Sequence, residues 1–187
     1  NTALGKSSME TNTTGAANTA VGKNCLQANT TANNNTGLGY AALTANTTGT
    51  NNVGVGSGAL EAHTTGNRNT AVGRAALQSS TTGADNIAIG FDALNDLTTG
   101  HSNVAIGGYA MDALTTGDSN VAVGHQALGV NTANNNTGLG AGALKVNSTG
   151  TANTAVGQNA MATNTTGESN TAVGLNALTA NTTAHYG

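Results

Sequence analysis

Aliphatic residues recur along this chain at a fixed distance and in the same polar setting. In the stretch 69–73, Asn-Thr-Ala-Val-Gly, one Val lies among small and polar residues. The stretch has ten further copies, separated by nine intervals of 17 residues and one of 16. A fixed period of this length predicts a stack of repeats from end to end. The repeats begin at residues 1, 18, 35, 52, 69, 86, 103, 120, 136, 153 and 170.

The consensus repeat is Asn-Thr-Ala-Val-Gly-x-x-Ala-Leu-x-x-Asn-Thr-Thr-Gly-x-x, which defines positions one to seventeen. Position four is always Val, Leu or Ile, and position nine is always Leu or Met. Position one is always Asn and position five is always Gly, and we predict that both columns form structural ladders. The Asn column is Asn1, Asn18, Asn35, Asn52, Asn69, Asn86, Asn103, Asn120, Asn136, Asn153 and Asn170. The Gly column is Gly5, Gly22, Gly39, Gly56, Gly73, Gly90, Gly107, Gly124, Gly140, Gly157 and Gly174.

A period of 17 residues is too short for a pair of helices and fits one coil of a parallel β-solenoid. We therefore predict an all-β single domain over residues 1–187, with eleven coils of two or three short strands each, cut from a longer array. Alternation along the first strand places positions two and four on one face, which we expect to be the core. The small residues at position three are then expected to meet the opposite wall or a neighbouring subunit.

The ladders have a physical explanation that needs no ligand. Stacked Asn amides can bond to one another and to corner carbonyls, and Gly permits a positive φ or a close backbone approach. The short repeat, 120–135, has Asn131-Thr132-Ala133 where most repeats have Asn-Thr-Thr-Gly. A one-residue slip would invert a strand, so we expect the missing residue to fall in the last corner.

The composition of the chain argues against several classes of function. The chain has a net charge of -3, 7% charged residues and 2% aromatic residues. Scattered cations and few aromatic rings make no nucleic-acid surface, and no apolar run approaches a membrane span. The single Cys excludes an internal disulfide framework. We predict no cofactor, no metal site, no nucleic-acid partner and no membrane insertion.

The residues able to carry chemistry do not form a constellation. His63, His101, His125 and His185 fall at positions twelve, sixteen, six and sixteen, so no two share a column in adjacent coils. We expect them to face solvent rather than to bind metal. Cys25 replaces the Ala of position eight and is expected to be a small packing residue. The repeated Asn, Thr and Gly supply no paired acid, base or nucleophile, so we predict that the protein is not an enzyme.

Five Asp residues in the fifth to seventh repeats raise the alternative of a cation site, which we disfavour because they occupy five different columns. They are Asp85, Asp92, Asp96, Asp112 and Asp118. Glycosylation sequons begin at several Asn residues of position twelve and at two of position seventeen. They are Asn12, Asn29, Asn46, Asn147, Asn164 and Asn181, with Asn34 and Asn135. We expect these Asn-x-Thr triplets to follow from the ladder rather than from glycosylation.

The consensus from Asn-Thr-Ala-Val-Gly to Asn-Thr-Thr-Gly resembles tandem repeats of phage tail-fibre-like and bacterial surface proteins that often end in an endosialidase-type chaperone domain. The Val-Ala-Ile-Gly at 104–107 also resembles the shorter head repeats of YadA-like trimeric autotransporter adhesins. These resemblances imply a left-handed β-roll, three chains side by side, and a fibre that touches a host or surface. Residues 1–187 show no pattern that predicts the chaperone domain, membrane anchor or stalk heptads of these families.

The favoured hypothesis is thus a structural, non-enzymatic module of an extracellular fibre or adhesin, on a cell surface or virion, with itself and a surface receptor as partners. Tyr40, Phe91 and Tyr109 are the exposed aromatic candidates for a contact. One alternative is a self-assembling filament, because neither end carries a polar capping repeat. Another is ice binding through a Thr ladder, although column twelve is interrupted and consecutive Thr residues should point to opposite faces.

Overall fold

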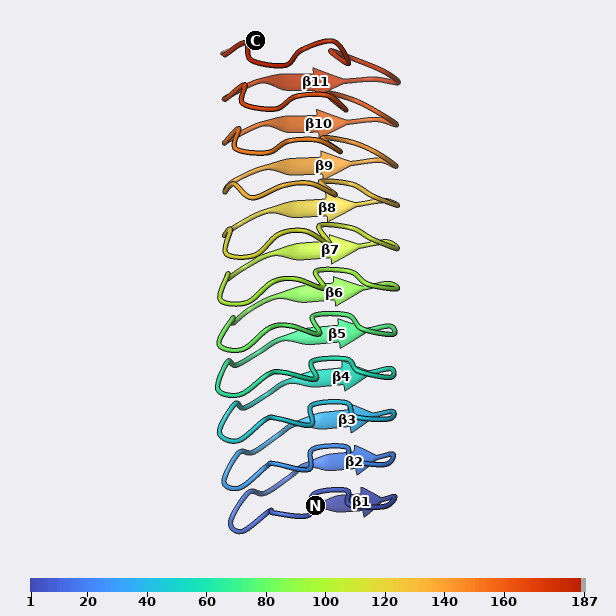
Figure 1. Ribbon diagram of the computed structural model, residues 1–187, viewed down its shortest axis with the longest axis vertical. Helices are drawn as coiled ribbons and strands as arrows, with labels where there is room; N and C mark the ends of the chain where they lie inside the picture. The colour runs from blue at the N-terminus through green and yellow to red at the C-terminus, as the bar shows by residue number, and fades with distance from the viewer. Residues whose placement is uncertain (186–187) are drawn as a thin grey trace.

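The chain forms a parallel β-solenoid, as the repeat predicted, in a computed structural model that describes residues 1–185. One strand from each repeat joins a single sheet of eleven parallel strands in sequence order. The coils lie one above another along the long axis, with the N-terminal coil at one end (Figure 1). The strands are β1 (Thr2–Leu4), β2 (Thr19–Val21), β3 (Thr36–Leu38), β4 (Val53–Val55), β5 (Thr70–Val72), β6 (Ile87–Ile89), β7 (Val104–Ile106), β8 (Val121–Val123), β9 (Thr137–Leu139), β10 (Thr154–Val156) and β11 (Thr171–Val173).

Each coil has one strand, so the prediction of two or three strands per coil was wrong. The return segment after the strand is a series of turns, because positions seven and nine have positive φ in all eleven coils. In the fifth coil these are Ala75 at 56° and Leu77 at 51°. A left-handed residue at every second position prevents an extended strand. Backbone hydrogen bonds still join the return segments of successive coils, as in Leu77 N–H to Ala93 O at 3.0 Å.

The sheet faces are the reverse of the prediction. Position three, which is Ala or Gly, points inward, and Ala71 and Ala88 are fully buried. Positions two and four point outward, so that Ile87 and Ile89 are each 38% exposed. The coil is too thin for a large side chain at position three, since a methyl group on Gly54 would already lie 3.3 Å from Cγ of Leu43.

The core therefore consists of small residues from the sheet and larger residues from the return segment. Position three packs on positions eight and nine, where Ala76 and Leu77 are both fully buried. The volumes are matched locally between coils. Cys25 is larger than the usual Ala, and its sulfur lies against Gly37, where an added Cβ would clash with it. Interiors of this density tolerate a larger residue only where a neighbour is smaller.

The Asn residues of position one form a buried column that holds successive coils together. The Asn86 Oδ1 accepts the backbone N–H of Asn103 at 2.9 Å, and the Asn86 Nδ2 donates to the Gly100 carbonyl at 2.9 Å. The same pair of bonds recurs at Asn52, which accepts from the Asn69 N–H at 2.9 Å and donates to Gly66 O at 3.0 Å. Each amide thus forms hydrogen bonds with two buried backbone groups that have no backbone partner among the described residues.

Position twelve is a second buried polar column with a weaker role. Asn46 Nδ2 donates to Gly49 O at 3.0 Å, but this carbonyl already accepts from Asn35 Nδ2 at 2.8 Å. Since the position-one Asn satisfies the carbonyl by itself, position twelve can change without leaving that group unpaired. His63, Ser80, Leu97 and Leu114 occupy the column in four consecutive coils.

The 16-residue coil loses its residue in the corner, as predicted. Ala133 takes the place of the position-fifteen Gly, because its carbonyl accepts from Asn120 Nδ2 at 2.9 Å. The next strand remains in register, with Val121 paired to Thr137 and Val123 to Leu139. The missing residue is therefore the second Thr of the corner, and the sheet is unaffected.

Candidate functional site

The outer face of the sheet carries two rows of side chains that run along all eleven strands. Position four contributes an aliphatic side chain from every strand, and position two contributes Thr, Val or Ile. Leu38 is 47% exposed, Ile106 is 37% exposed, and no residue of these two columns is charged. In-register pairing aligns the side chains in two straight rows. A continuous row of solvent-facing aliphatic side chains, as at position four, is a candidate interaction surface.

A second feature is a strip of rings at the corner that follows the sheet. Phe91, Tyr109 and His125 lie in three consecutive coils, at positions six, seven and six. The Phe91 and Tyr109 ring centroids are 5.2 Å apart and those of Tyr109 and His125 are 5.9 Å apart, both edge to face. Phe91 and Tyr109 are exposed, at 38% and 37%, as the sequence hypothesis requires. We call these three residues the aromatic strip.

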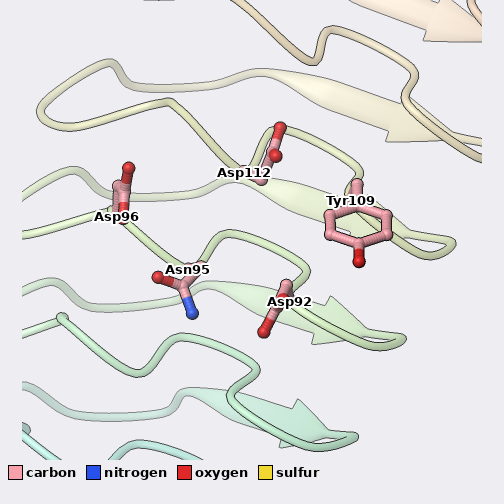
Figure 2. Close-up of a pocket in the computed structure, with 5 residues that line it drawn as sticks. All are labelled: Asp92, Asn95, Asp96, Tyr109 and Asp112. Atoms are coloured by element: carbon pink, nitrogen blue, oxygen red, sulfur yellow. The ribbon is translucent and has the colours of Figure 1, made fainter.

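A pocket of about 150 Å³ lies beside the aromatic strip and is lined by Tyr109, Asp92, Asn95, Asp96 and Asp112. Figure 2 shows that these side chains come from the return segments of two neighbouring coils, on the side of the coil away from the strands. Burial raises the pKa of the Asp112 carboxyl, and the charges of Asp96 and Asp92 raise it further. The pocket therefore combines one ring with a concentrated negative charge. We call it the acidic pocket.

The other two Asp residues have structural partners elsewhere. The Asp85 carboxylate accepts from Nε of Arg68 at 2.6 Å, and this bond lowers the pKa of Asp85. Asp118 Oδ1 accepts the backbone N–H of His101 at 2.7 Å. Within residues 1–185, no group of three His, Cys, Asp or Glu side chains is arranged to hold a metal ion.

The structure places the histidines in three different settings. His101 and His185 each accept a backbone N–H of the preceding coil through Nδ1, from Ala84 at 3.0 Å and from Glu168 at 3.1 Å. His125 belongs to the aromatic strip. His63 is fully buried, so the prediction that it faces solvent was wrong. Its position-twelve column lies inside the coil, and the imidazole replaces an Asn amide on the Gly66 carbonyl at 2.8 Å.

His63 makes the fold sensitive to acid. Burial lowers the pKa of His63 below its ordinary value of 6.5, so the unfolded chain takes up this proton at a higher pH than the folded chain. We expect the free energy of unfolding to fall as the pH drops below about 6.5. The slope for this one proton is at most about 1.4 kcal/mol per pH unit. Denaturant unfolding of the wild type and His63→Asn at pH 7.5 and 5.5 measures it.

The substituted chain is the internal control, because Asn is the consensus residue of position twelve. His63→Asn is expected to lose less stability between the two pH values than the wild type does. An equal acid-induced loss in both proteins would show that other groups are responsible.

The role of position sixteen was not predicted from the sequence. Here a side-chain acceptor of one coil receives the position-sixteen N–H of the preceding coil, as in Ala16 N–H to Asn33 Oδ1 at 2.6 Å and Thr50 N–H to Asn67 Oδ1 at 2.7 Å. The frequent Asn, Asp and His at this position carried the signal, since these residues share a short side chain with an acceptor atom.

The remaining candidates are structural. Cys25 is fully buried and burial raises the pKa of its thiol to about 11, so it is a packing residue rather than a nucleophile. The Asn residues of the sequons at 29, 46, 147 and 164 are fully buried, whereas Asn34 and Asn135 are exposed. The Thr pair lies in a corner and not in a strand, and Thr13 Oγ1 donates to Thr30 O at 3.0 Å.

These features define a single-sheet parallel β-solenoid with an uncharged outer sheet face and a separate aromatic and acidic corner. Compared with known protein families, curated proteins and solved structures, the chain gives no match. Over residues 1–185 the structure holds no helix of the length and apolarity that a membrane span requires.

Proposed function

We propose that this protein is a structural, non-enzymatic module of an extracellular fibre or adhesin, in which three chains pack with their outer sheet faces toward a common axis. The observation that supports this proposal is the outer sheet face itself. It exposes an aliphatic residue in each strand and no charge in either row. Burial of such side chains against another chain contributes about 25 cal/mol per Å² of apolar surface removed from water.

Another copy of this chain fits the outer sheet face well, because the side-chain rows of both copies repeat at the same distance. Strands of all copies carry side chains at the same spacing, about 4.8 Å between coils, so the rows of two chains can interlock along the whole rod. The resemblance to trimeric surface proteins favours three chains and a left-handed coil. The return segments, which carry the aromatic strip and the acidic pocket, would then form the outside of the fibre.

Light scattering across a range of concentrations tests this assembly. The expected result is a constant mass near three chains. Three chains whose outer sheet faces meet at a common axis cover one another and leave no such face for a fourth chain. The double variant Ile89→Lys/Ile106→Lys places two charges on the outer sheet face and is expected to give monomers. Val130→Lys/Val146→Lys is the matched control, because these two Val residues are exposed to a similar degree, at 49% and 38%, but lie on the return segment.

Each other outcome has a definite meaning. A wild-type monomer would contradict the trimer, and a mass that grows with concentration would favour a filament. Dissociation of the Val130→Lys/Val146→Lys control would show that the return segments, not the sheet faces, hold the chains together.

Ice binding is the second candidate function. The Thr residues of the outer sheet face are better placed for it than the Thr pair of the corner. Seven of the eleven position-two residues are Thr, in the runs Thr2 to Thr36 and Thr137 to Thr171 and at Thr70. They stand beside the aliphatic row on one sheet, whereas the corner hydroxyls of the Thr13 column are bound to backbone carbonyls. Thermal hysteresis of a monomeric sample would support this function, and its absence would remove it.

A further inference from the structure

The buried column of position twelve consists of two runs of Asn with four other residues between them. Within each run the amide of one coil donates to the side-chain oxygen of the coil before it, as in Asn29 Nδ2 to Asn12 Oδ1 at 2.7 Å. This ladder is interrupted by His63, Ser80, Leu97 and Leu114. The two Leu side chains need no hydrogen bond, whereas His63 and Ser80 carry polar atoms into the column.

The interruption leaves three buried side-chain atoms without a hydrogen-bond partner in the described part of the chain. They are Asn46 Oδ1, His63 Nδ1 and Ser80 Oγ, which belong to three consecutive coils. All three residues are fully buried. A buried polar atom without a partner is costly, and folded proteins commonly supply an ordered water where no protein group is within reach.

The hydrogen bond at the other ring nitrogen determines the role of His63 Nδ1. Nε2 lies 2.8 Å from the Gly66 carbonyl, and a carbonyl only accepts, so Nε2 carries the proton of the neutral ring. Burial lowers the pKa of His63, although backbone bonds to Gly66 and Ser80 raise it, and the ring is therefore neutral at pH 7. Nδ1 of this neutral ring is an acceptor. It needs a donor, which a backbone carbonyl cannot supply.

The Ser80 side chain is too short to supply this donor. A consensus Asn donates from Nδ2 both to the side chain of the preceding coil and to the position-fifteen carbonyl of its own coil, as Asn29 does. Ser lacks the carboxamide group and leaves more room. An added Cβ on Gly83 would lie 3.1 Å from Ser80 Oγ. The same atom on Gly49 would lie only 2.5 Å from Asn46 Oδ1.

We infer that a water molecule is bound between His63 and Ser80, in the place of the missing carboxamide. Its O–H groups donate to His63 Nδ1 and to the Gly83 carbonyl, and its oxygen accepts the hydroxyl proton of Ser80. About three hydrogen bonds are typical of a buried water. The Gly83 carbonyl also accepts from Asn69 Nδ2 at 2.8 Å, so the water gives it the second donor that Gly49 has. This inference goes beyond the proposed function and does not depend on assembly.

The chemistry of the site favours water over a metal ion. The available atoms are a neutral imidazole nitrogen, a hydroxyl oxygen and a carbonyl oxygen, and position twelve carries no carboxylate in any coil. A metal cation would be buried there without a negative partner, which is costly. Asn46 Oδ1 belongs to the coil on the other side of His63 and stays outside the site. The imidazole fills that side, since an added Cβ on Gly66 would lie 2.5 Å from His63 Cε1.

Oxygen-17 magnetic relaxation dispersion, which counts waters held for longer than the protein takes to tumble, tests the inference at pH 7.5. Ser80→Asn restores the consensus carboxamide and is expected to lower the count by about one water. Ser80→Leu introduces the residue of the next two coils and is expected to lower it equally. Ser79→Leu is the matched control, because Ser79 lies beside Ser80 but outside the buried column, and the count should not change.

The nitrogen-15 resonance of His63 Nδ1 is a second readout on the same samples. In Ser80→Leu the nitrogen loses its donor, so its resonance should move downfield. In Ser80→Asn the amide replaces the water as donor, and the resonance should stay near that of the wild type.

An equal water count in the wild type and both Ser80 variants would overturn the inference. The same Nδ1 resonance in the wild type and Ser80→Leu would overturn it as well, because no donor would then have been lost. A lower count in Ser79→Leu would also contradict it, since the long-lived water would then not belong to the buried column. Light scattering on the same samples reports separately on the assembly, so a failure here and a failure of the proposed function can be told apart.

Discussion

Asn86→Leu is expected to destabilise the solenoid by roughly 3–5 kcal/mol, because the substitution leaves two buried backbone groups without partners. The Asn103 N–H loses its acceptor, Asn86 Oδ1, and the Gly100 carbonyl loses its donor, Asn86 Nδ2. In this coil position twelve is Leu97, which cannot donate in place of Asn86. Denaturant unfolding followed by circular dichroism measures the loss, and hydrogen exchange at the Asn103 amide locates it.

Two further Leu substitutions grade this effect. In Asn35→Leu the Gly49 carbonyl keeps a donor, Asn46 Nδ2 at 3.0 Å, so only the Asn52 N–H is left unpaired and the loss should be smaller. Asn46→Leu removes only side-chain bonds and the second donor of that carbonyl, and about 1 kcal/mol is expected. Similar losses in all three variants would show that burial of any Asn, and not its backbone bonds, determines stability.

Gly107→Ala is expected to cost more than about 3 kcal/mol, because both the backbone conformation and the available space are restricted to Gly. Gly107 has a φ of 133°, and an added Cβ would lie 2.7 Å from the carbonyl carbon of Gly124 in the next coil. The neighbouring atoms are backbone and cannot move aside. Thermal unfolding of the variant is expected to show a lower Tm.

The adjacent residue provides the control. Gly108 follows Gly107 directly, has no restrictive φ, and an added Cβ would be 3.7 Å from the nearest atom, Cδ2 of His125. Gly108→Ala is therefore expected to change stability by less than about 1 kcal/mol, with a gain where the unfolded chain loses freedom. A loss of comparable size in both variants would contradict the assignment of position five as a conformational requirement.

The repeat length was sufficient to predict the fold class. Seventeen residues with Asn and Gly in fixed columns leave few architectures other than a β-solenoid coil, and the structure has that architecture. The position of the shortened corner near Ala133 was also predictable, since a strand cannot lose one residue without turning its side chains over.

The side of the sheet that faces the core was not predictable from alternation. Val72 and its equivalents were assigned to the core because they are aliphatic in every repeat, but constant aliphatic character fits an interface equally well. The decisive quantity is the thickness of the coil, which admits only Ala71 or a similar small residue between the sheet and Leu77. This thickness depends on the left-handed residues of the return segment, which no hydrophobic pattern reveals.

The candidate site could be predicted in part. Tyr40, Phe91 and Tyr109 were predicted to be exposed aromatic residues, and all three are exposed in the structure. The acidic pocket was not, because Asp92, Asp96 and Asp112 occupy three different columns and were judged too scattered to act together. Adjacent coils bring side chains of neighbouring columns as close as those of one column, so a search restricted to columns misses such a cluster.

In the described part of the chain, strands contact only the strands of the two adjacent coils. This arrangement determines how the number of repeats can change in evolution. Gain or loss of one whole repeat leaves every remaining coil with the same two neighbours. The length of the rod is therefore inherited in discrete steps of about 4.8 Å, one for each block of coding sequence that is duplicated or deleted. Selection can therefore adjust the length of the rod without new packing contacts between coils.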